Sequence, residues 1–233
     1  MLIKWSYLFI FVEKYSLNMQ NTKIIIFDFD GTLADTTSVI IKTMQATIKE
    51  LKLPARTDEQ CASMIGLRMV EILPVLFPEC DIEFDLYAQT YKRCFDIINA
   101  AEPVQLYPNV LETLHELKNR GIVLTVASSR SNPSLNDYIR NLNLTGLISL
   151  VLSANDVNEG KPNPEAIYRT LSQFGFNCDE AIMVGDTMFD IRMGVNAGCR
   201  TCGVTYGVGS SESLSDATWI IEDFKQLLNI LEN

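Results

Sequence analysis

Two aspartates stand two positions apart directly after an apolar run near the start of the chain. The run Ile24 to Phe27 leads into Asp28, Phe29 and Asp30, and then into a glycine and a threonine. Because residues two apart on a strand share a face, we expect the two carboxylates side by side where the strand ends. Open α/β sheets bind ligands at the carboxyl ends of their strands. Carboxylates this close repel each other, which favours a shared proton, a bound divalent metal ion, or both.

A second pair of aspartates follows another apolar run later in the chain. Gly185 and Asp186 come directly after residues 181–184, and Asp190 lies four positions further on. If a helix begins there, both acids face the same side near its positive N-terminal end. Oxygen ligands without nitrogen or sulfur favour Mg²⁺ over zinc. Aspartates also often cap helices at such turns, so this motif alone is a weak signal.

Two further polar residues complete a candidate phosphate site. Ser128 follows the apolar run 122–127, and Lys161 lies in a loop that two prolines stiffen. Alone, a serine at a strand end is usually a turn residue, and a lysine in a loop is usually solvated. Together they would offer neutral and cationic donors to a phosphate group whose charge a metal ion also offsets.

Six short apolar runs, rich in β-branched residues, alternate with helical patterns along the chain. Such runs are typical of buried strands, and the alternation predicts a parallel α/β sheet. The strands are expected at residues 23–27, 122–127, 148–152, 181–184, 201–204 and 218–221.

Capping residues mark the start of two helices in this pattern. Asn109, with Glu112 three positions on, is expected to cap a helix that begins at Val110. Asn163 is expected to cap another helix, with Pro164 at its first position.

One interval is too long for a simple connection between neighbouring strands. About 100 residues separate Asp28 from Ser128, whereas a crossover needs about a dozen residues plus its helix. The interval has helical periodicity, so we expect a helical domain over 37–103, inserted into a core of 19–36 and 104–233. We expect residues 1–18 to be an N-terminal extension. The alternating strand and helix pattern begins only at Lys23, which suggests that translation starts at Met19.

The net charge and the short apolar run near the N-terminus limit which partners and which cellular location we expect for this protein. The chain has 233 residues and a formal net charge of −10, which argues against nucleic acid and anionic membranes as partners. The apolar run Tyr7 to Val12 is far shorter than the roughly 20 residues of a membrane-spanning helix, and no signal-peptide cleavage pattern follows it. We expect a cytoplasmic protein, either a monomer or a homodimer, that acts on a small molecule.

The ordered motifs resemble those of the haloacid dehalogenase superfamily. They are Asp28 to Leu33, Ser128, Lys161 and Gly185 to Asp190, and the similarity extends over Lys23 to Leu231. The resemblance implies a Rossmann-like parallel sheet with an inserted α-helical cap domain. Within the superfamily, the chain looks most like the phosphoglycolate phosphatase group.

The resemblance also implies a Mg²⁺-dependent phosphatase mechanism. Asp28 would attack phosphorus and form an aspartyl-phosphate, and Asp30 would act as general acid and then as general base. The metal ion would be held by the Asp28 side chain, the Asp30 backbone carbonyl and Asp186, with Asp190 nearby. Phosphate or substrate binding would involve Thr32, Ser128, Ser129, Lys161 and Arg68.

Departures from the family pattern leave some roles open. Many relatives carry Thr-Asn-Lys where this chain has Ser128, Ser129 and Arg130, so Arg130 is either a substrate contact or a charge at a helix start. Arg68 lies in a stretch similar to the substrate-facing loop of the cap, which makes it a candidate anion contact.

Other functions remain as alternatives at this point. A β-phosphoglucomutase-like mutase shares the motifs, although its relatives tend to carry valine in place of Thr32. A pyrophosphatase also fits, whereas a true dehalogenase would lack the second acid, Asp30. A non-catalytic module that binds a phosphorylated ligand would not need a general acid. The sequence does not identify the substrate.

Overall fold

The computed structural model describes residues 21–232. The expected extension 1–18 and the suggested start at Met19 lie outside these residues.

The core is a six-stranded parallel sheet in the order β3-β2-β1-β4-β5-β6. Each of the six expected runs contains or overlaps one strand, so the predicted α/β class is confirmed. The strands are β1 (Ile24–Phe27), β2 (Val123–Ala127), β3 (Leu150–Leu152), β4 (Ala181–Gly185), β5 (Arg200–Val204) and β6 (Trp219–Ile221).

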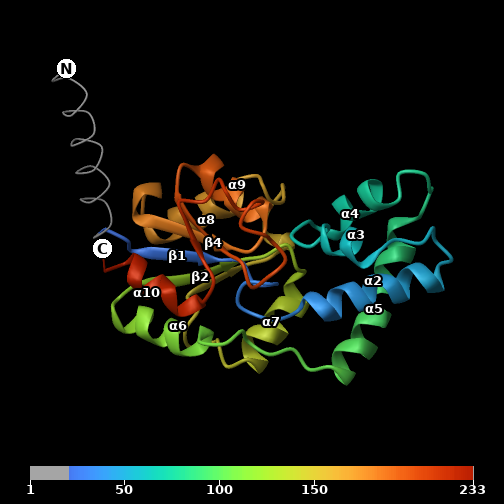
Figure 1. Cartoon of the computed structure of the whole chain (residues 1–233), viewed down its shortest axis with the longest axis horizontal. Coiled ribbons are helices and arrows are strands. Elements are labelled where there is room, and N and C mark those ends of the chain that lie inside the picture. Colours follow the sequence, from blue (N-terminus) through green and yellow to red (C-terminus); the bar gives the residue numbers. More distant parts are fainter. Residues whose placement is uncertain (1–20, 233) are drawn as a thin grey trace, which may run out of the picture.

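Helices cover both faces of this sheet, as Figure 1 shows. Along the fully buried β1, Ile24 and Ile26 pack toward α8 (Glu165–Phe174) and α9 (Met188–Ala197). The alternate residues Ile25 and Phe27 belong to a second apolar cluster on the opposite face. That cluster contains side chains of α6 (Val110–Asn119), α7 (Asn132–Asn141) and α10 (Leu227–Ile230). The central strand therefore ends inside the protein, between two helical layers.

Two predicted helix caps differ in detail from the structure. Helix α6 begins at Val110, as expected, but Asn109 adopts a left-handed conformation and makes no capping hydrogen bond; its side-chain amide donates to Asp223 instead, so the capping part of this prediction is wrong. Helix α8 begins one residue later than expected, at Glu165, but Asn163 Oδ1 does accept from the backbone N–H of Glu165 at 3.0 Å.

Four helices lie between β1 and α6 and form a separate lobe (Figure 1). They are α2 (Thr37–Glu50), α3 (Asp58–Ala62), α4 (Met69–Leu76) and α5 (Phe84–Ala101). This lobe, called the cap below, has its own apolar cluster, which includes Met44, Leu73, Phe77 and Tyr87. Three short 3₁₀ helices complete the described structure, at Ala154–Asp156, Cys178–Glu180 and Phe224–Gln226.

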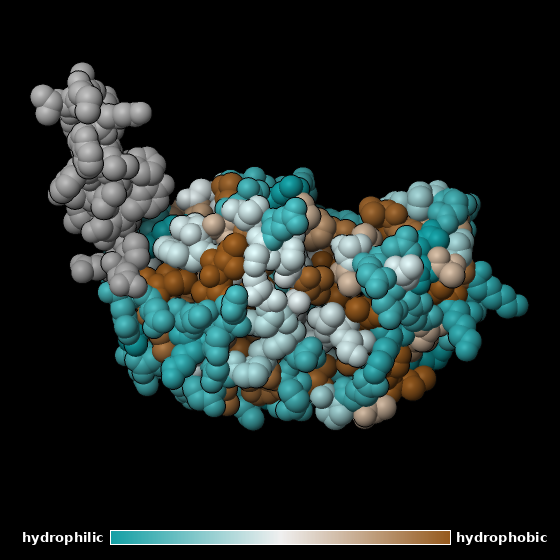
Figure 2. All heavy atoms as spheres, viewed as in Figure 1, coloured by the Kyte–Doolittle hydropathy of each residue, from teal (hydrophilic) through white to brown (hydrophobic). Residues whose placement is uncertain are grey.

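Hydrophilic residues are spread over both the core and the cap on the face shown in Figure 2, and apolar residues are scattered between them. Within residues 21–232, no helix combines the length and the apolar character that crossing a bilayer requires.

Candidate active site

Asp28 is the first residue beyond the end of β1, at the centre of the sheet. Its backbone N–H donates to the Val184 carbonyl at 2.8 Å, which holds it beside the end of β4. The side chain is buried, and its Oδ1 contacts the ammonium of Lys161. The same ammonium lies 2.7 Å from Asp190 Oδ1. Lys161 reaches this point from the loop before α8, so one buried cation joins two carboxylates from different parts of the core.

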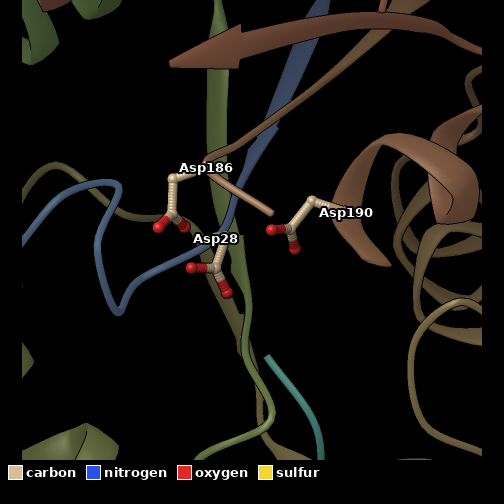
Figure 3. Close-up of side chains that lie close together, drawn as sticks. All are labelled: Asp28, Asp186 and Asp190. Atoms are coloured by element: carbon tan, nitrogen blue, oxygen red, sulfur yellow. The ribbon is translucent and has the colours of Figure 1, made fainter. Parts of the chain in front are cut away.

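The carboxylates of Asp28, Asp186 and Asp190 point toward one another, as Figure 3 shows. Asp28, Asp186 and Asp190 are all buried, and each offers an oxygen within 4.8 Å of the others. Asp186 follows β4, and Asp190 lies in the first turn of α9. The predicted pairing of these two acids at a strand-to-helix turn therefore matches the geometry.

Protein donors fix the orientation of Asp186 and Asp190. Asp186 Oδ1 accepts from the Thr32 hydroxyl at 3.1 Å, and Oδ2 accepts from the backbone N–H of Val208 at 2.8 Å. Asp190 Oδ2 accepts from the backbone N–H of Thr187 at 3.0 Å and from its hydroxyl at 2.6 Å. This second arrangement is a capping box, so Asp190 both starts α9 and contributes to the acidic cluster.

Burial and mutual repulsion shift the pKa values in this cluster. Burial raises the pKa of Asp28 well above its ordinary value, although Lys161 opposes this shift. Burial and the nearby Asp190 raise the pKa of Asp186 to about 7. Burial alone would lower the pKa of Lys161, but Asp190 and Asp28 outweigh it and raise the pKa. When its three carboxyl groups are ionised, the cluster holds more negative charge than its lysine balances, and its all-oxygen donors fit a hard divalent cation such as Mg²⁺.

Two glycines allow the backbone to lie directly against Asp186. A Cβ atom at Gly31, where φ is +85°, would lie 2.2 Å from Asp186 Oδ2, and one at Gly207 would lie 2.4 Å from the same oxygen. Larger residues at these positions would displace the carboxylate. The loop after β1 and the loop after β5 therefore both close around Asp186.

Asp30 points to a different partner from Asp28. Because β1 ends at Phe27 and the chain then turns, the expected alternation of a strand does not extend through residue 30. Arg130 Nε lies 3.2 and 3.1 Å from the two carboxylate oxygens of Asp30, and Nη2 lies 2.5 Å from Oδ1. The carboxylates of Asp28 and Asp30 are therefore paired with separate cations, and the acidic cluster found within residues 21–232 does not include the Asp30 side chain.

The remaining candidate residues lie where the cap meets the core. Ser128 Oγ accepts from the backbone N–H of Arg130 at 3.2 Å. Ser129 Oγ donates to the carbonyl of Gly66, in the cap, at 2.6 Å. Arg68 is paired with Glu71 and donates to the carbonyl of Asn158, in the core, at 2.8 Å.

A small cavity of about 10 Å³ lies at this junction, lined in part by Arg68, Ser128, Ser129 and Lys161. A cavity of this size holds about one water molecule. A larger, open hollow of about 450 Å³ adjoins it, lined in part by Arg68, Glu71 and Lys161.

One contributor to the site and one pairing within it are not marked in the sequence. The backbone N–H of Val208 has no side-chain signature, and only its place in the glycine-containing stretch 207–209 could have suggested a close backbone approach. Arg130 was noted, but its pairing with Asp30 was not, because 100 positions separate them.

Comparison with known proteins identifies the family. The profile of the family described as haloacid dehalogenase-like hydrolase matches residues 25–204, so the chain belongs to this family. The expected superfamily, fold class and enzyme class, that of a phosphatase-type hydrolase, are confirmed.

Individual relatives are similar over nearly the whole chain. The chain is 30% identical over 221 residues to a phosphoglycolate phosphatase of Photorhabdus laumondii, covering 91% of this chain and 94% of the relative. It is 32% identical over 209 residues to the pyrophosphatase PpaX of Bacillus velezensis, covering 88% and 94%. The crystal structure of a predicted phosphoglycolate phosphatase from Haemophilus somnus is similar with a TM-score of 0.77 and 26% identity, covering 90% of this chain and 98% of that one.

Proposed function

We propose that this protein is a Mg²⁺-dependent phosphatase that hydrolyses a small organic phosphomonoester through an aspartyl-phosphate on Asp28. The observation that carries the proposal is the contact of the buried Lys161 ammonium with Asp28 inside the acidic cluster. A buried cation beside a buried carboxylate favours the ionised form that attack on phosphorus requires.

The reaction proceeds in two displacements at phosphorus. In the first, Asp28 attacks the phosphorus atom, and Asp30 protonates the departing oxygen of the substrate. In the second, Asp30 removes a proton from water, and that water attacks the phosphorus of the aspartyl-phosphate. Lys161 and Ser128 bind the transferring phosphoryl group, to which Thr32 and Ser129 are the further predicted contacts.

The acidic cluster supplies the residues that would hold the metal ion. These are the side chains of Asp28 and Asp186, with Asp190 beside them; the backbone carbonyl of Asp30 is the further ligand that the family resemblance implies. When bound, Mg²⁺ supplies positive charge that stabilises the transferring phosphoryl group. Thr32 and Val208 keep Asp186 oriented for this role.

The substrate is proposed to be a small phosphomonoester that resembles phosphoglycolate. The phosphoglycolate phosphatase relatives support this choice. Arg68 is the candidate contact for an anionic group on the substrate. Pyrophosphate is the second candidate, because a PpaX relative is 32% identical to this chain.

Further parts of the proposal rest on the sequence. They are the division into a core of 19–36 and 104–233 with a cap of 37–103, a cytoplasmic location, and a monomeric or homodimeric state.

Release of inorganic phosphate by the purified protein tests the proposed function. We expect Mg²⁺-dependent hydrolysis of 4-nitrophenyl phosphate that EDTA abolishes and that Asp28→Asn abolishes. Asp96→Asn is the matched control, because Asp96 is an exposed carboxylate on the cap. Retained activity in Asp28→Asn would contradict the assignment of the nucleophile. A panel of phosphorylated metabolites, including phosphoglycolate and pyrophosphate, then separates the two substrate candidates.

A further inference from the structure

Arg130 and Asp30 form a buried ion pair whose purpose the mechanism above leaves open. The guanidinium makes three contacts with the Asp30 carboxylate, at 3.2, 3.1 and 2.5 Å. The two side chains are only 10% and 14% exposed. A forked guanidinium restricts both the position and the rotation of a carboxylate more strongly than a lysine can. The orientation of Asp30 is therefore set by Arg130.

Arg130 is itself held in place from the core. Its Nη1 donates to the hydroxyl of Ser134 in α7 at 2.9 Å. The guanidinium carbon also lies 4.9 Å from the centre of the Tyr138 ring, in the same helix. Cations over aromatic rings at such distances are attracted to the ring face.

The cap holds the same guanidinium from the other side. Its carbon lies 5.2 Å from the centre of the Phe95 ring, which belongs to α5. Phe95 meets Tyr138 edge-on at 6.4 Å, and the Tyr138 hydroxyl donates to Asn99, also in α5. The position of Arg130 thus depends on a cap helix, whereas Asp30 belongs to the core.

We propose that Arg130 is a positioning residue that aims the Asp30 carboxyl group at the departing oxygen when the cap is seated. This inference rests on the proposed phosphatase function. In the first displacement, the bond from Asp28 to phosphorus forms, and the bond from phosphorus to the leaving oxygen breaks. Before this step Asp30 takes up a proton from solvent, which weakens its pairing with Arg130. The proton then moves to the leaving oxygen, and the resulting carboxylate pairs with Arg130 as in the structure. In the second displacement, the attacking water gives one of its own protons to Asp30, its oxygen bonds to phosphorus, and the bond from Asp28 to phosphorus breaks.

Two aryl esters separate this role from a structural one. The 4-nitrophenolate ion departs readily without a proton, whereas phenolate is a poorer leaving group and depends more on the general acid. We expect Arg130→Met to lower kcat/KM for phenyl phosphate by about 100-fold, in the range of general acid contributions. The loss for 4-nitrophenyl phosphate should be less than about tenfold. The ratio kcat/KM is used because it excludes hydrolysis of the aspartyl-phosphate.

Further variants test whether the cap positions Arg130, and they control for a loss of folding in Arg130→Met. Arg140→Met in α7 is the control, because Arg140 is 65% exposed and pairs only locally with Asp137. Phe95→Leu should also affect phenyl phosphate more than 4-nitrophenyl phosphate, because it removes the cap ring from the guanidinium. The double variant Asp30→Asn with Arg130→Met leaves no unpaired buried charge, and it should be no less active than Asp30→Asn alone.

The outcomes distinguish this inference from the proposed function. Equal losses on both esters, or a further loss in the double variant, would overturn the positioning role. A raised inhibition constant for inorganic phosphate in Arg130→Met would also overturn it, because Arg130 would then contact the substrate. If the wild-type protein hydrolyses neither ester, the proposed function fails together with the inference. If Arg130→Met does not fold, the same comparison of the two esters is made with Phe95→Leu and with the double variant.

Discussion

The ammonium of Lys161 contacts Asp28, although 133 positions separate the two residues in the chain. Asp28 is placed by the end of β1, and Lys161 by the loop that precedes α8. Both side chains are buried, and the lysine also contacts Asp190. The proposed nucleophile is therefore held at its attacking position by a cation that the core itself supplies.

Removal of this cation should affect both stability and activity. Lys161→Met leaves Asp28 and Asp190 buried without their shared partner. We expect the free energy of unfolding to fall by about 3–5 kcal/mol at pH 8, which is the usual cost of breaking a buried pair. Denaturant unfolding measures this change, and phosphate release should be lost as well.

Lys92→Met is the control for the lysine substitution. Lys92 is 74% exposed and pairs with Asp96 on the surface of α5, so its removal should change stability by less than about 1 kcal/mol. Equal losses in the two variants would contradict the buried pair described here.

Substitution of Gly31 should weaken the metal site without a general loss of the fold. A methyl group there would overlap Asp186 Oδ2, and φ at this position is +85°. We expect Gly31→Ala to raise the Mg²⁺ concentration for half-maximal activity roughly 10–100-fold, as for other changes that disturb ligand orientation. A titration of activity against Mg²⁺ measures this.

Gly121→Ala provides the matched control for backbone strain. Gly121 has a similar φ of +80°, but a methyl group there would meet nothing within 4 Å. Both variants carry strain of about 1 kcal/mol or more from the left-handed backbone, so a difference in Mg²⁺ requirement reports on Asp186 alone. An equal requirement in the two variants would contradict the role of Asp186.

Stabilisation by Mg²⁺ should depend on pH. Burial and Asp190 raise the pKa of Asp186 to about 7 in the absence of metal. A carboxyl group with a raised pKa takes up a proton more readily in the folded chain than in the unfolded one. Its contribution to stability is therefore fully present at low pH and is lost as the pH rises toward 7. Mg²⁺ needs the ionised group, so its binding strengthens over the same range.

Thermal unfolding with Mg²⁺ or EDTA measures this dependence. We expect Mg²⁺ to raise Tm more at pH 8 than at pH 6, and Asp186→Asn should remove most of the difference. An equal shift of Tm at both pH values in the wild-type protein would count against Asp186 as a ligand.

Ser129 offers a test between phosphate binding and cap closure. Its hydroxyl donates to the Gly66 carbonyl across the junction of core and cap. Loss of one such hydrogen bond costs about 1 kcal/mol, so Ser129→Ala should raise KM about fivefold with little effect on inhibition by inorganic phosphate. Weaker inhibition by phosphate would instead support the direct phosphate contact predicted from the sequence. Ser63→Ala is the control, because Ser63 is an exposed serine within the cap.

The sequence predicts the sheet well because its strands are buried on both faces. Such strands are continuous apolar runs, and Ile24 to Phe27 is fully buried. The side-chain contacts that cap the helices are less predictable. Asn109 has the residue type of a cap, but its amide binds Asp223, which is 114 positions away. A local sequence pattern does not show that a residue far along the chain will bind the side chain that was expected to cap the helix.

The sequence predicts which residues form the candidate site, but it does not predict which of them contact one another. The acids at the ends of β1 and β4 follow from their positions after buried runs. The separation of Asp28 from Asp30 does not, because it depends on where β1 ends and on the reach of Arg130. The contact of Val208 with Asp186 is made by the backbone, so no residue type marks it.

The most direct test of the account is a crystal structure of the protein soaked with Mg²⁺ and beryllofluoride, which mimics a phosphoryl group on a carboxylate. We expect the adduct on a side-chain oxygen of Asp28, with the Lys161 ammonium beside it. An adduct on any other residue, or a Lys161 side chain directed away from it, would contradict the proposed nucleophile and the mechanism built on it.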